Sequence, residues 1–316
     1  MKIVVVGSAL MDIAVKHTDG FELFSEKGRK YFSIPYGSKI EVREIEMHVG
    51  GSGHNVAADL AKLGHHVSFV GKLGNDYLSK QILEDFRHDK VDIKNLRIVT
   101  NAKGGFSIIF LLPDGEKSIM VYNGYNLDLK PRDVPVPELE DAGWLVFTSV
   151  TTSSSLKFLR ESIRIAKKNH VKILANPSIR MIKLRRKELI GFLKSADVAI
   201  MNREEITELT GKKSLVSSLK KLSRMGPRIS VATVGSKGAV AFDGTKIVKE
   251  NGYKVRIVDS TACGDSFTAG FLHYLLKGRG ISESLRFANK SAALQCLYVG
   301  SESLPEKTIL GFRPKN

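Results

Sequence analysis

Two aspartates frame a loop of small side chains in the segment VDSTACGDSFTAGF, residues 258–271. Only small residues stand between Asp259 and Asp265, and an apolar run typical of a helix follows. The first N–H groups of a helix have no partner within the helix, and its dipole is positive there. Small residues also let an anion approach the backbone closely. Ala262, Cys263 and Gly264 therefore predict an anion hole for a phosphate group.

Asp265 stands in the first turn of this predicted helix and has two interpretations. It is a helix cap, since Asp caps helices well. Alternatively it is a general base, placed to take a proton from a hydroxyl that attacks a phosphoryl group in the hole. A cap does not require a loop of small side chains before it. Cys263 has no histidine near it in the sequence to activate it, and we interpret it as a small residue that fits the hole.

A second glycine-rich segment, GGSGHNVAADLAKLG, occupies residues 50–64 between a predicted strand and a predicted helix. It differs from a dinucleotide fingerprint, because Val56 stands where Gly or Ala is needed and no acidic residue follows at the usual spacing. The P-loop pattern GxxxxGK[ST] does not occur in the sequence. A dehydrogenase is therefore disfavoured, and a phosphotransferase would work without a P-loop.

Predicted strands and helices alternate along most of the chain, which indicates an α/β fold with a mostly parallel sheet covered on both faces. Half-exposed strands at 31–35 and 40–49, and a hairpin of 105–112 with 117–122 around PDGE, predict a small separate sheet. We also expect a strand at 255–258, and a type I′ turn at Asp243-Gly244. The main strands are predicted at 2–6, 67–70, 144–147, 171–175, 198–201, 229–234, 238–242 and 246–250, and the helices at 53–63, 78–86, 155–168, 204–209, 215–224, 265–276 and 282–297.

The composition is that of a globular protein, with 42% hydrophobic and 26% charged residues in 316. A net charge of +16 suggests an anionic ligand or a basic surface. The basic residues are spread along the chain without interleaved aromatics, so nucleic-acid binding is not expected. No apolar run approaches the ~18–20 residues that span a bilayer. Two cysteines do not form a disulfide framework, and a cytoplasmic location is expected.

Together, the segments at 50–64 and 258–265 resemble the two signature regions of the ribokinase-like (PfkB) family of sugar and nucleoside kinases. The resemblance extends from Gly7 to Pro305. It implies one domain over 1–316, a three-layer α/β/α sandwich with a small β-sheet lid from about 13–49 and 104–124. It also implies transfer of the γ-phosphoryl group of ATP, with Mg²⁺, to a primary hydroxyl of a sugar or, alternatively, of a nucleoside. Lid strands in this family can pair between subunits, and the half-exposed run 31–49 permits a homodimer without requiring it.

The resemblance also assigns residues. Asp265 matches the catalytic base, and Ala262, Cys263 and Gly264 match the anion hole. Asn202 and Glu205 match an N-x-x-E motif for phosphate and Mg²⁺, although on sequence alone they equally form a capping box. The nucleotide would contact Thr233, Gly235, Ser236, Gly238 and Asn289, and the acceptor would contact Asp12, Gly50, Gly51 and Asn55. A monovalent cation such as K⁺ would lie at Asp259, Thr261, Gly300 and Ser303.

Two departures from ribokinase proper concern the acceptor. Leu10 stands where ribokinase has Asn, and residues 148–150 lack its sugar-binding Glu. Ribose is therefore not implied, and a different sugar or a nucleoside fits these losses. A nucleoside base would stack on lid aromatics such as Tyr31, Phe32, Tyr36 or Phe106. A non-catalytic binding protein of the same fold is expected to lack the base or the hole, and this chain keeps both.

Overall fold

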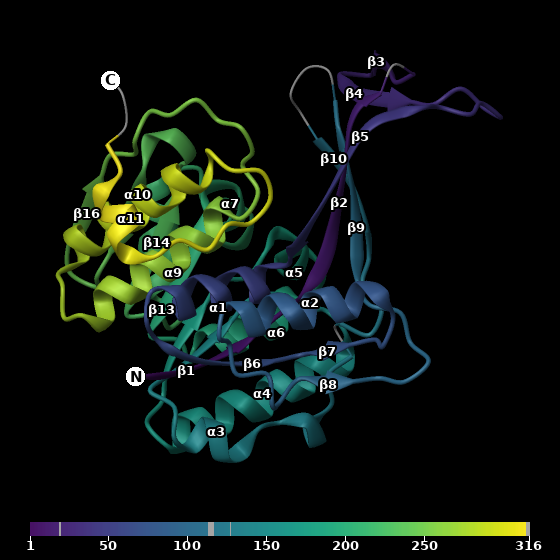
Figure 1. The fold of residues 1–316 in the computed structure, drawn as a ribbon. Coiled ribbons are helices and arrows are strands. Elements are labelled where there is room, and N and C mark those ends of the chain that lie inside the picture. Colours follow the sequence, from purple (N-terminus) through teal and green to yellow (C-terminus); the bar gives the residue numbers. More distant parts are fainter. Residues whose placement is uncertain (19, 113–116, 127, 314–316) are drawn as a thin grey trace.

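The computed structural model of the chain describes residues 1–18, 20–112, 117–126 and 128–313. An eight-stranded sheet forms its centre (Figure 1). In spatial order its strands are β16 (Ile247–Glu250), β15 (Ala239–Phe242), β14 (Ile229–Thr233), β13 (Val198–Asn202), β12 (Lys172–Ala175), β11 (Trp144–Phe147), β1 (Lys2–Val6) and β6 (His66–Val70). The six strands from β14 to β6 are parallel, and β15 and β16 are antiparallel to their neighbours. The predicted mostly parallel sheet is confirmed.

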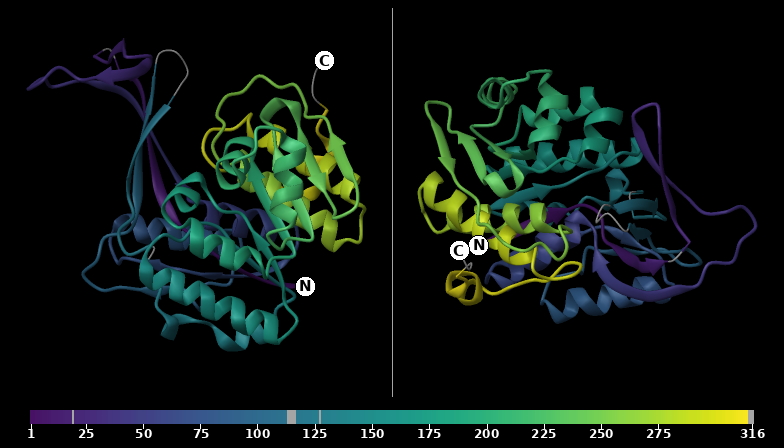
Figure 2. Two further views of the ribbon diagram at one scale, coloured as in Figure 1. Left: turned by 180° about the vertical axis from the view of Figure 1, so that it is seen from behind. Right: turned by 90° about the horizontal axis from the view of Figure 1, so that it is seen from above.

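Helices cover both faces of this sheet, as the three views show (Figures 1 and 2). After Lys2, β1 is apolar because both of its faces are buried: Ile3 and Val5 belong to one core, and Val4 belongs to the other. The first core is completed by α1 (Ser52–Lys62), α2 (Tyr77–His88), α9 (Cys263–Leu276), α10 (Ile281–Gln295) and α11 (Glu306–Gly311). The second is completed by α3 (Val136–Glu140), α4 (Ser153–Lys168), α5 (Ile179–Leu184), α6 (Arg186–Leu193), α7 (Arg203–Thr210) and α8 (Leu215–Ser223). The three-layer arrangement is thereby confirmed.

A small sheet rises from the main body as a separate arm (Figures 1 and 2). Its order is β10 (Lys117–Tyr122), β9 (Phe106–Leu111), β2 (Leu10–Thr18) and β5 (Val42–Gly50), with a hairpin of β3 (Glu22–Glu26) and β4 (Arg29–Ser33) beside it. The predicted separate sheet is confirmed, although β2 and β3 were not among the predicted strands. The PDGE turn lies outside the described residues. None of the helices in the described ranges is long and apolar enough to cross a membrane.

The predicted strand at 255–258 is wrong. Residues 251–262 connect β16 to α9 as a loop without helix or strand. Ile257 and Val258 are each 59% exposed, so they do not belong to a buried strand. The N–H of Val258 donates to the carbonyl of Cys296 at 2.8 Å. β16 is already the edge of the main sheet, and the chain leaves the sheet there to reach α9.

The predicted type I′ turn at Asp243-Gly244 is also wrong, although the pairing of β15 with β16 is confirmed. A type I′ turn needs positive φ at both central residues. Only Gly244 of the pair has one, at 93°. The Asp243 carboxylate instead accepts the N–H groups of Thr245 at 2.9 Å and Lys246 at 2.8 Å, and so closes the loop of residues 243–246 itself.

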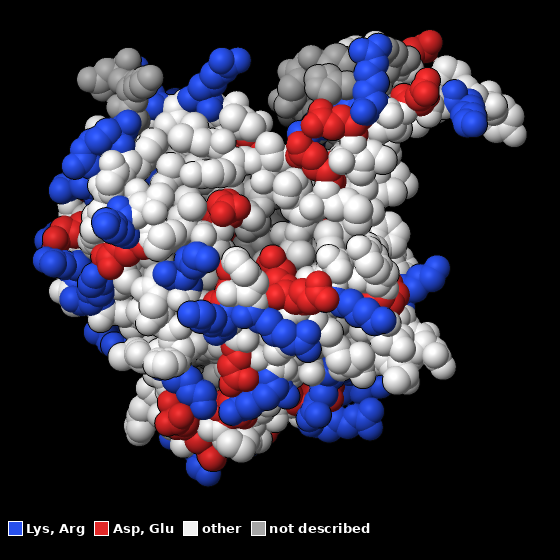
Figure 3. Space-filling model, in the orientation of Figure 1, with Lys and Arg blue, Asp and Glu red and all other residues white. Residues whose placement is uncertain are grey.

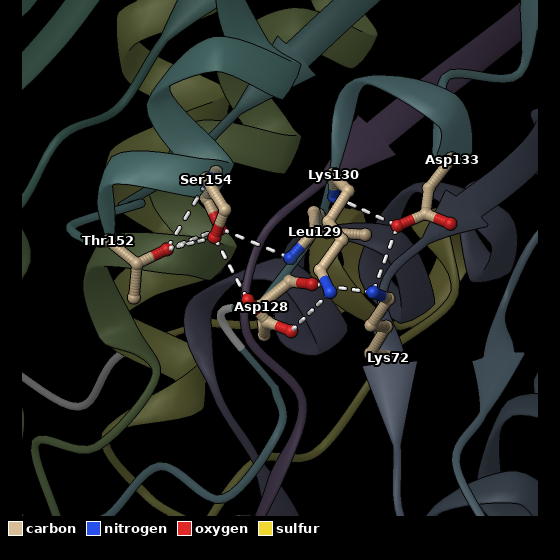
Figure 4. A network of polar contacts seen from close by, with 8 residues as sticks. Lys72, Asp128, Leu129, Lys130, Asp133, Thr152 and Ser154 are labelled. Atoms are coloured by element: carbon tan, nitrogen blue, oxygen red, sulfur yellow. Dashed lines mark hydrogen bonds and ion pairs between the residues drawn. The ribbon is translucent and has the colours of Figure 1, made fainter.

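A buried lysine fastens the chain that follows β10 to the main body. Lys72, in the short strand β7 (Lys72–Leu73), pairs with Asp133 at 2.9 Å and donates to the carbonyl of Asp128 at 2.5 Å (Figure 4). The Asp128 carboxylate accepts the hydroxyl of Ser154, in the first turn of α4, at 2.9 Å. The N–H of Lys130 also donates to Asp133, at 2.8 Å. The arm therefore joins the main body through a segment held by charge and hydrogen bonds.

Candidate active site

The N-cap of α9 is Ala262, whose backbone is left-handed with φ 59° and whose side chain makes no capping bond. The carbonyl of Ala262 accepts the N–H of Ser266 at 2.9 Å. The N–H groups of Cys263, Gly264 and Asp265 thus precede the first hydrogen bond of the helix. A Cβ on Gly264 would meet open space. The free N–H groups and the positive end of the helix dipole lie at an opening that suits a phosphate.

Asp265 is not the cap of this helix, because it is the third helical residue and Ala262 takes the cap position. Its Oδ2 accepts a hydrogen bond from Nδ2 of Asn55, on α1, at 2.8 Å. The residue as a whole is half-buried, but its carboxyl group is enclosed by protein. Burial raises the pKa of Asp265 to about 7, against the opposing effect of the bond from Asn55. A carboxyl group of this kind accepts a proton near neutral pH.

A pocket of about 130 Å³ opens beside Asp265 at the carboxyl ends of β12, β13 and β14. In open α/β sheets this is the edge at which ligands bind. The pocket brings Asp265 and Gly264 together with three of the predicted nucleotide residues. Its lining consists of Ser52, Asn176, Pro177, Ser178, Ile200, Met201, Asn202, Glu205, Thr233, Gly264 and Asp265.

Asn202 and Glu205 form a capping box and line the pocket as well. Oδ1 of Asn202 accepts the N–H of Glu205 at 2.9 Å, and Oε2 of Glu205 accepts the N–H of Asn202 at 2.7 Å. The capping box is therefore confirmed, and the role in binding phosphate and Mg²⁺ stays a prediction. Burial raises the pKa of Glu205, and hydrogen bonds from the backbone of Asn202 and Ile179 oppose this. The carboxylate is held in place facing the pocket, and its oxygens fit the water shell of a hydrated Mg²⁺.

The predicted nucleotide loop follows β14. Thr233 lines the pocket, while Gly235 and Ser236 are exposed in a single 3₁₀ turn, Gly235–Lys237. Gly238 has φ 90°, and a Cβ there would collide with the backbone of residues 250–252. Asn289, on α10, is only 6% exposed and donates to the carbonyls of Glu250 at 3.2 Å and Asn251 at 3.1 Å. Asn289 therefore positions residues 250–252 against the loop, with its amide hydrogens already used.

The predicted acceptor residues gather where β2, β5 and α1 meet. Oδ1 of Asp12 accepts a short hydrogen bond from the hydroxyl of Ser107, on β9. A Cβ on Gly50 would collide with the Asp12 carboxylate. Gly51 caps α1 with φ 95°, and a Cβ there would lie 2.7 Å from the carbonyl oxygen of Ser8. Burial raises the pKa of Asp12, and the bond from Ser107 opposes this. Since Asn55 bonds Asp265, the acceptor residues adjoin the proposed base.

The predicted cation residues come together only in part, and a lysine contacts two of them. Asp259 accepts the N–H groups of Thr261 at 2.9 Å and Gly300 at 3.0 Å. Burial favours the neutral form of Asp259, but these bonds outweigh it and lower its pKa. Nζ of Lys117, on β10, lies 3.0 Å from Oγ1 of Thr261 and 3.6 Å from Asp259.

Ser303 is not part of this group, because its side chain bonds Asp59, a buried residue of α1. The carboxylate oxygens that a cation would need are occupied by N–H groups and an ammonium. The residues present therefore do not fit the monovalent-cation site that the resemblance implies, and no step of the chemistry is assigned to such an ion.

The model of the pfkB family of carbohydrate kinases matches residues 1–308. The chain belongs to this family. A ribokinase of Haemophilus influenzae is 29% identical over 282 residues, which cover 86% of this chain and 89% of that protein. A 5-dehydro-2-deoxygluconokinase of Clostridium perfringens is 26% identical over 282 residues, 84% of this chain and 83% of that protein. The predicted family and its kinase class are confirmed.

Solved structures of pfkB-type kinases share the fold. Arabidopsis thaliana ribokinase, solved with ribose and ATP, has a TM-score of 0.81 and 27% identity over 99% of both chains. An adenosine kinase from Sinorhizobium meliloti has a TM-score of 0.82 at 22% identity over 95% of both chains, which is a likeness of fold alone. The pfkB chain described here therefore has the fold of both sugar kinases and a nucleoside kinase.

Several residues around the pocket of this pfkB-family protein were not predicted from the sequence. Asn176 and Ser178 follow directly after β12, and Ser52 opens α1. The position of Asn176 and Ser178 after a parallel strand is the signal that could have identified them. Ser107 and Lys117 belong to strands of the arm, and their contacts with Asp12 and Thr261 join segments far apart in the sequence. Sequence spacing contains no signal for those contacts.

Proposed function

We propose that this chain is an ATP-dependent kinase that transfers the γ-phosphoryl group of ATP to a primary hydroxyl of a sugar. The observation that carries the proposal is the pocket of about 130 Å³ in which Asp265 and the open end of α9 meet Asn202 and Glu205. Phosphoryl transfer needs a base, N–H donors for the phosphoryl oxygens and a carboxylate near the phosphates, and this pocket contains all three.

In the proposed reaction, Asp265 accepts the proton of the acceptor hydroxyl. The hydroxyl oxygen forms a bond to the γ-phosphorus, and the bond between the γ-phosphorus and the ADP oxygen breaks. The N–H groups of Cys263, Gly264 and Asp265 donate to the phosphoryl oxygens and stabilise the charge on them. Asn55 holds the Asp265 carboxylate in place through its 2.8 Å bond. Glu205 and Asn202 would hold Mg²⁺ through its water shell, and the bound ion supplies charge neutralisation on the phosphates.

A sugar is favoured over a nucleoside by the packing of the arm's aromatic rings. Tyr31 stacks on Phe24 with ring centroids 5.4 Å apart, and Phe32 packs against Phe110 at 5.4 Å. Phe106 packs against Tyr122 at 5.4 Å. These three rings already contact other rings, which leaves fewer faces on which a base could stack, and of the four predicted aromatics Tyr36 is the one that is fully exposed. The sugar names among the relatives support the same choice, and a nucleoside remains the alternative acceptor.

An ADP-release screen with Mg·ATP tests the proposal and chooses the acceptor. It would compare ribose, fructose, 2-keto-3-deoxygluconate, fructose 6-phosphate and the common nucleosides, each against an ATP-only control. We expect acceptor-dependent ADP release with a sugar. Release with nucleosides alone would establish the alternative, and no release above the ATP-only control with any acceptor would contradict the proposal.

The raised pKa of Asp265 predicts the pH dependence of the reaction. A general base must be ionised, so kcat/KM should rise with pH through about 7 and then level off. Asn55→Ala removes a donor that favours the carboxylate, so the pKa of Asp265 should rise further and the rising limb should move to higher pH. Rates would be measured from pH 5 to 9, with Asn75→Ala, an exposed asparagine, as the matched control. A limb that stays in place in Asn55→Ala would contradict the assignment.

We also propose that the arm is a lid over the acceptor and that two copies pair through it. Its edge strands β5 and β10 expose large apolar side chains, among them Ile45 at 58% and Met120 at 63%. An exposed strand edge can pair with another chain, and large exposed apolar patches mark interaction sites. Analytical ultracentrifugation should give a dimer, and Met120→Glu should shift it towards monomer. A wild-type protein that sediments as a monomer at tens of micromolar would exclude this pairing.

A further inference from the structure

The two cysteines of the chain meet at the rim of the anion hole. Cys263 is the first helical residue of α9, and Cys296 caps the C-terminus of α10. Their Sγ atoms lie 2.6 Å apart, and both residues are half-buried and form no disulfide. A disulfide bond is about 2.05 Å long, so the two sulfurs are already closer to bonding distance than to an ordinary contact of sulfur atoms. No other cysteine occurs in the 316 residues, so these two thiols have only each other as partners within the chain.

The backbone around this pair is linked as well. The N–H groups of Val258 and Asp259 donate to the carbonyl of Cys296, at 2.8 and 3.3 Å. Cys296, at the C-terminal end of α10, therefore contacts the anion-hole loop twice. Its carbonyl accepts the N–H groups of Val258 and Asp259, and its sulfur contacts that of Cys263. Residues 251–262 have no regular secondary structure and can adjust locally when the sulfurs approach.

We propose that Cys263 and Cys296 are an oxidation site. A reversible disulfide between them displaces an N–H group of the anion hole and slows phosphoryl transfer. The disulfide itself does not depend on the function proposed above, whereas the effect on rate rests on it. The oxidant is of the peroxide class. The reaction is written with Cys296 as the attacking thiol, and exchanging the roles of the two thiols gives the same products.

The chemistry balances in two steps. The Cys296 thiolate attacks one oxygen of hydrogen peroxide, the O–O bond breaks, and hydroxide leaves and is protonated to water. The resulting sulfenic acid is then attacked by the sulfur of Cys263, the S–S bond forms, and the S–O bond breaks. The departing hydroxide accepts the proton of the Cys263 thiol and becomes the second water. In sum, two thiols and one peroxide give one disulfide and two waters.

Closing the bond should disturb the hole because Cys263 supplies one of its N–H groups. The sulfurs approach by about half an ångström, which draws the first residue of α9 towards the end of α10. Catalytic groups displaced by about 1 Å cost up to about 100-fold in rate, so a shift of a few tenths should cost less but remain measurable. We expect kcat to fall at least about threefold, and dithiothreitol to restore it.

The experiment uses the full chain, reduced and then treated with hydrogen peroxide, alkylated under denaturing conditions and measured by intact mass. We expect a loss of about 2 Da, no alkylation, and a linked peptide that joins residues 263 and 296. In parallel, kcat is measured before oxidation, after it, and after dithiothreitol. Two alkylated thiols after treatment, or sulfinic acids without a linked peptide, would overturn the proposal.

Cys296→Ser is the matched control, because it removes the partner thiol and leaves the anion hole intact. Its kcat should be insensitive to the same peroxide treatment. Inactivation of this variant equal to that of the wild type would show that the loss of rate does not come from the disulfide. A linked wild-type protein with unchanged kcat would show that the disulfide does not slow phosphoryl transfer. A failure of the proposed kinase function would be distinct, since the reduced protein would then release no ADP while the mass measurement still reports on the bond.

Discussion

Replacing Asp265 with asparagine is expected to lower kcat by about 10³-fold while fold and ATP binding remain. Asparagine has the same shape as the carboxylate but cannot accept the proton of the acceptor hydroxyl. Asn55 still finds an oxygen at this position, so the contact between α1 and α9 is kept. The measurements are kcat by ADP release, ATP affinity by calorimetry, and the thermal unfolding midpoint.

Asp141→Asn is the matched control, since it makes the same chemical change on a side chain that is 77% exposed. We expect its kcat to stay within twofold of the wild type. Near-normal turnover in Asp265→Asn would exclude Asp265 as the base. Loss of ATP affinity or of the folded state together with turnover would instead assign Asp265 a structural role.

Replacing Lys72 with alanine should lower the free energy of unfolding by about 3–5 kcal/mol, because it leaves a buried carboxylate without its cation. The side chains of Lys72 and Asp133 are only 8% and 10% exposed, and they pair at 2.9 Å. The carbonyl of Asp128 loses its donor in the same variant. Chemical denaturation at pH 7 measures the change; at that pH Asp133 is ionised, since Lys72 and the Lys130 N–H overcome the effect of burial and lower its pKa.

Two further variants separate charge from packing. Lys80→Ala, on the exposed face of α2, should change stability by less than about 0.5 kcal/mol. The double variant Lys72→Met with Asp133→Asn removes both charges while keeping side-chain volume, and it should recover a large part of the loss. If Lys72→Ala and Lys80→Ala unfold alike, the network of Figure 4 does not stabilise the fold.

The basic net charge is not explained by the site. On the face drawn in Figure 3, lysines and arginines are interspersed with aspartates and glutamates over the main body. A salt-titrated gel shift would detect any nucleic-acid binding, since phosphate contacts weaken steeply with salt.

The layers and the main helices could be predicted because their signals are local. The apolar run of β1 identifies a buried strand without reference to other segments. The small residues before α9 likewise predict an anion-binding helix N-terminus. The prediction of a strand at 255–258 was wrong because these apolar residues lie in a loop that leaves the edge of the sheet. Local composition cannot distinguish a loop at the edge of a sheet from a strand in its interior.

The candidate site divides in the same way. Asp265 and Asn202 were found because each stands at the start of a helix after a loop or strand, which is a sequence pattern. That Asn55 bonds Asp265, and that Ser303 turns to Asp59 instead of Asp259, depends on how α1 packs against α9. Contacts between residues some two hundred positions apart follow from the packing of whole elements, and a single sequence does not report them.

The contact of Lys117 with Thr261 and Asp259 has a thermodynamic consequence. One ammonium group links the arm, which carries Lys117, to the loop at the phosphate end of the site. An anion bound in the hole would give this ammonium a further partner. With the arm as the lid proposed above, occupation of the nucleotide site should favour the arm position that covers the acceptor. Such coupling is reciprocal and typically amounts to about 1–3 kcal/mol.

Calorimetry should therefore show the acceptor binding about 5–150-fold more tightly in the presence of a non-hydrolysable ATP analogue than in its absence. Lys117→Met should reduce this ratio towards one, with the affinity for the nucleotide alone changing less. Equal acceptor affinity with and without the analogue would mean that the two substrates bind independently. In the coupled case, a single lysine of the arm makes each substrate an effector for the other.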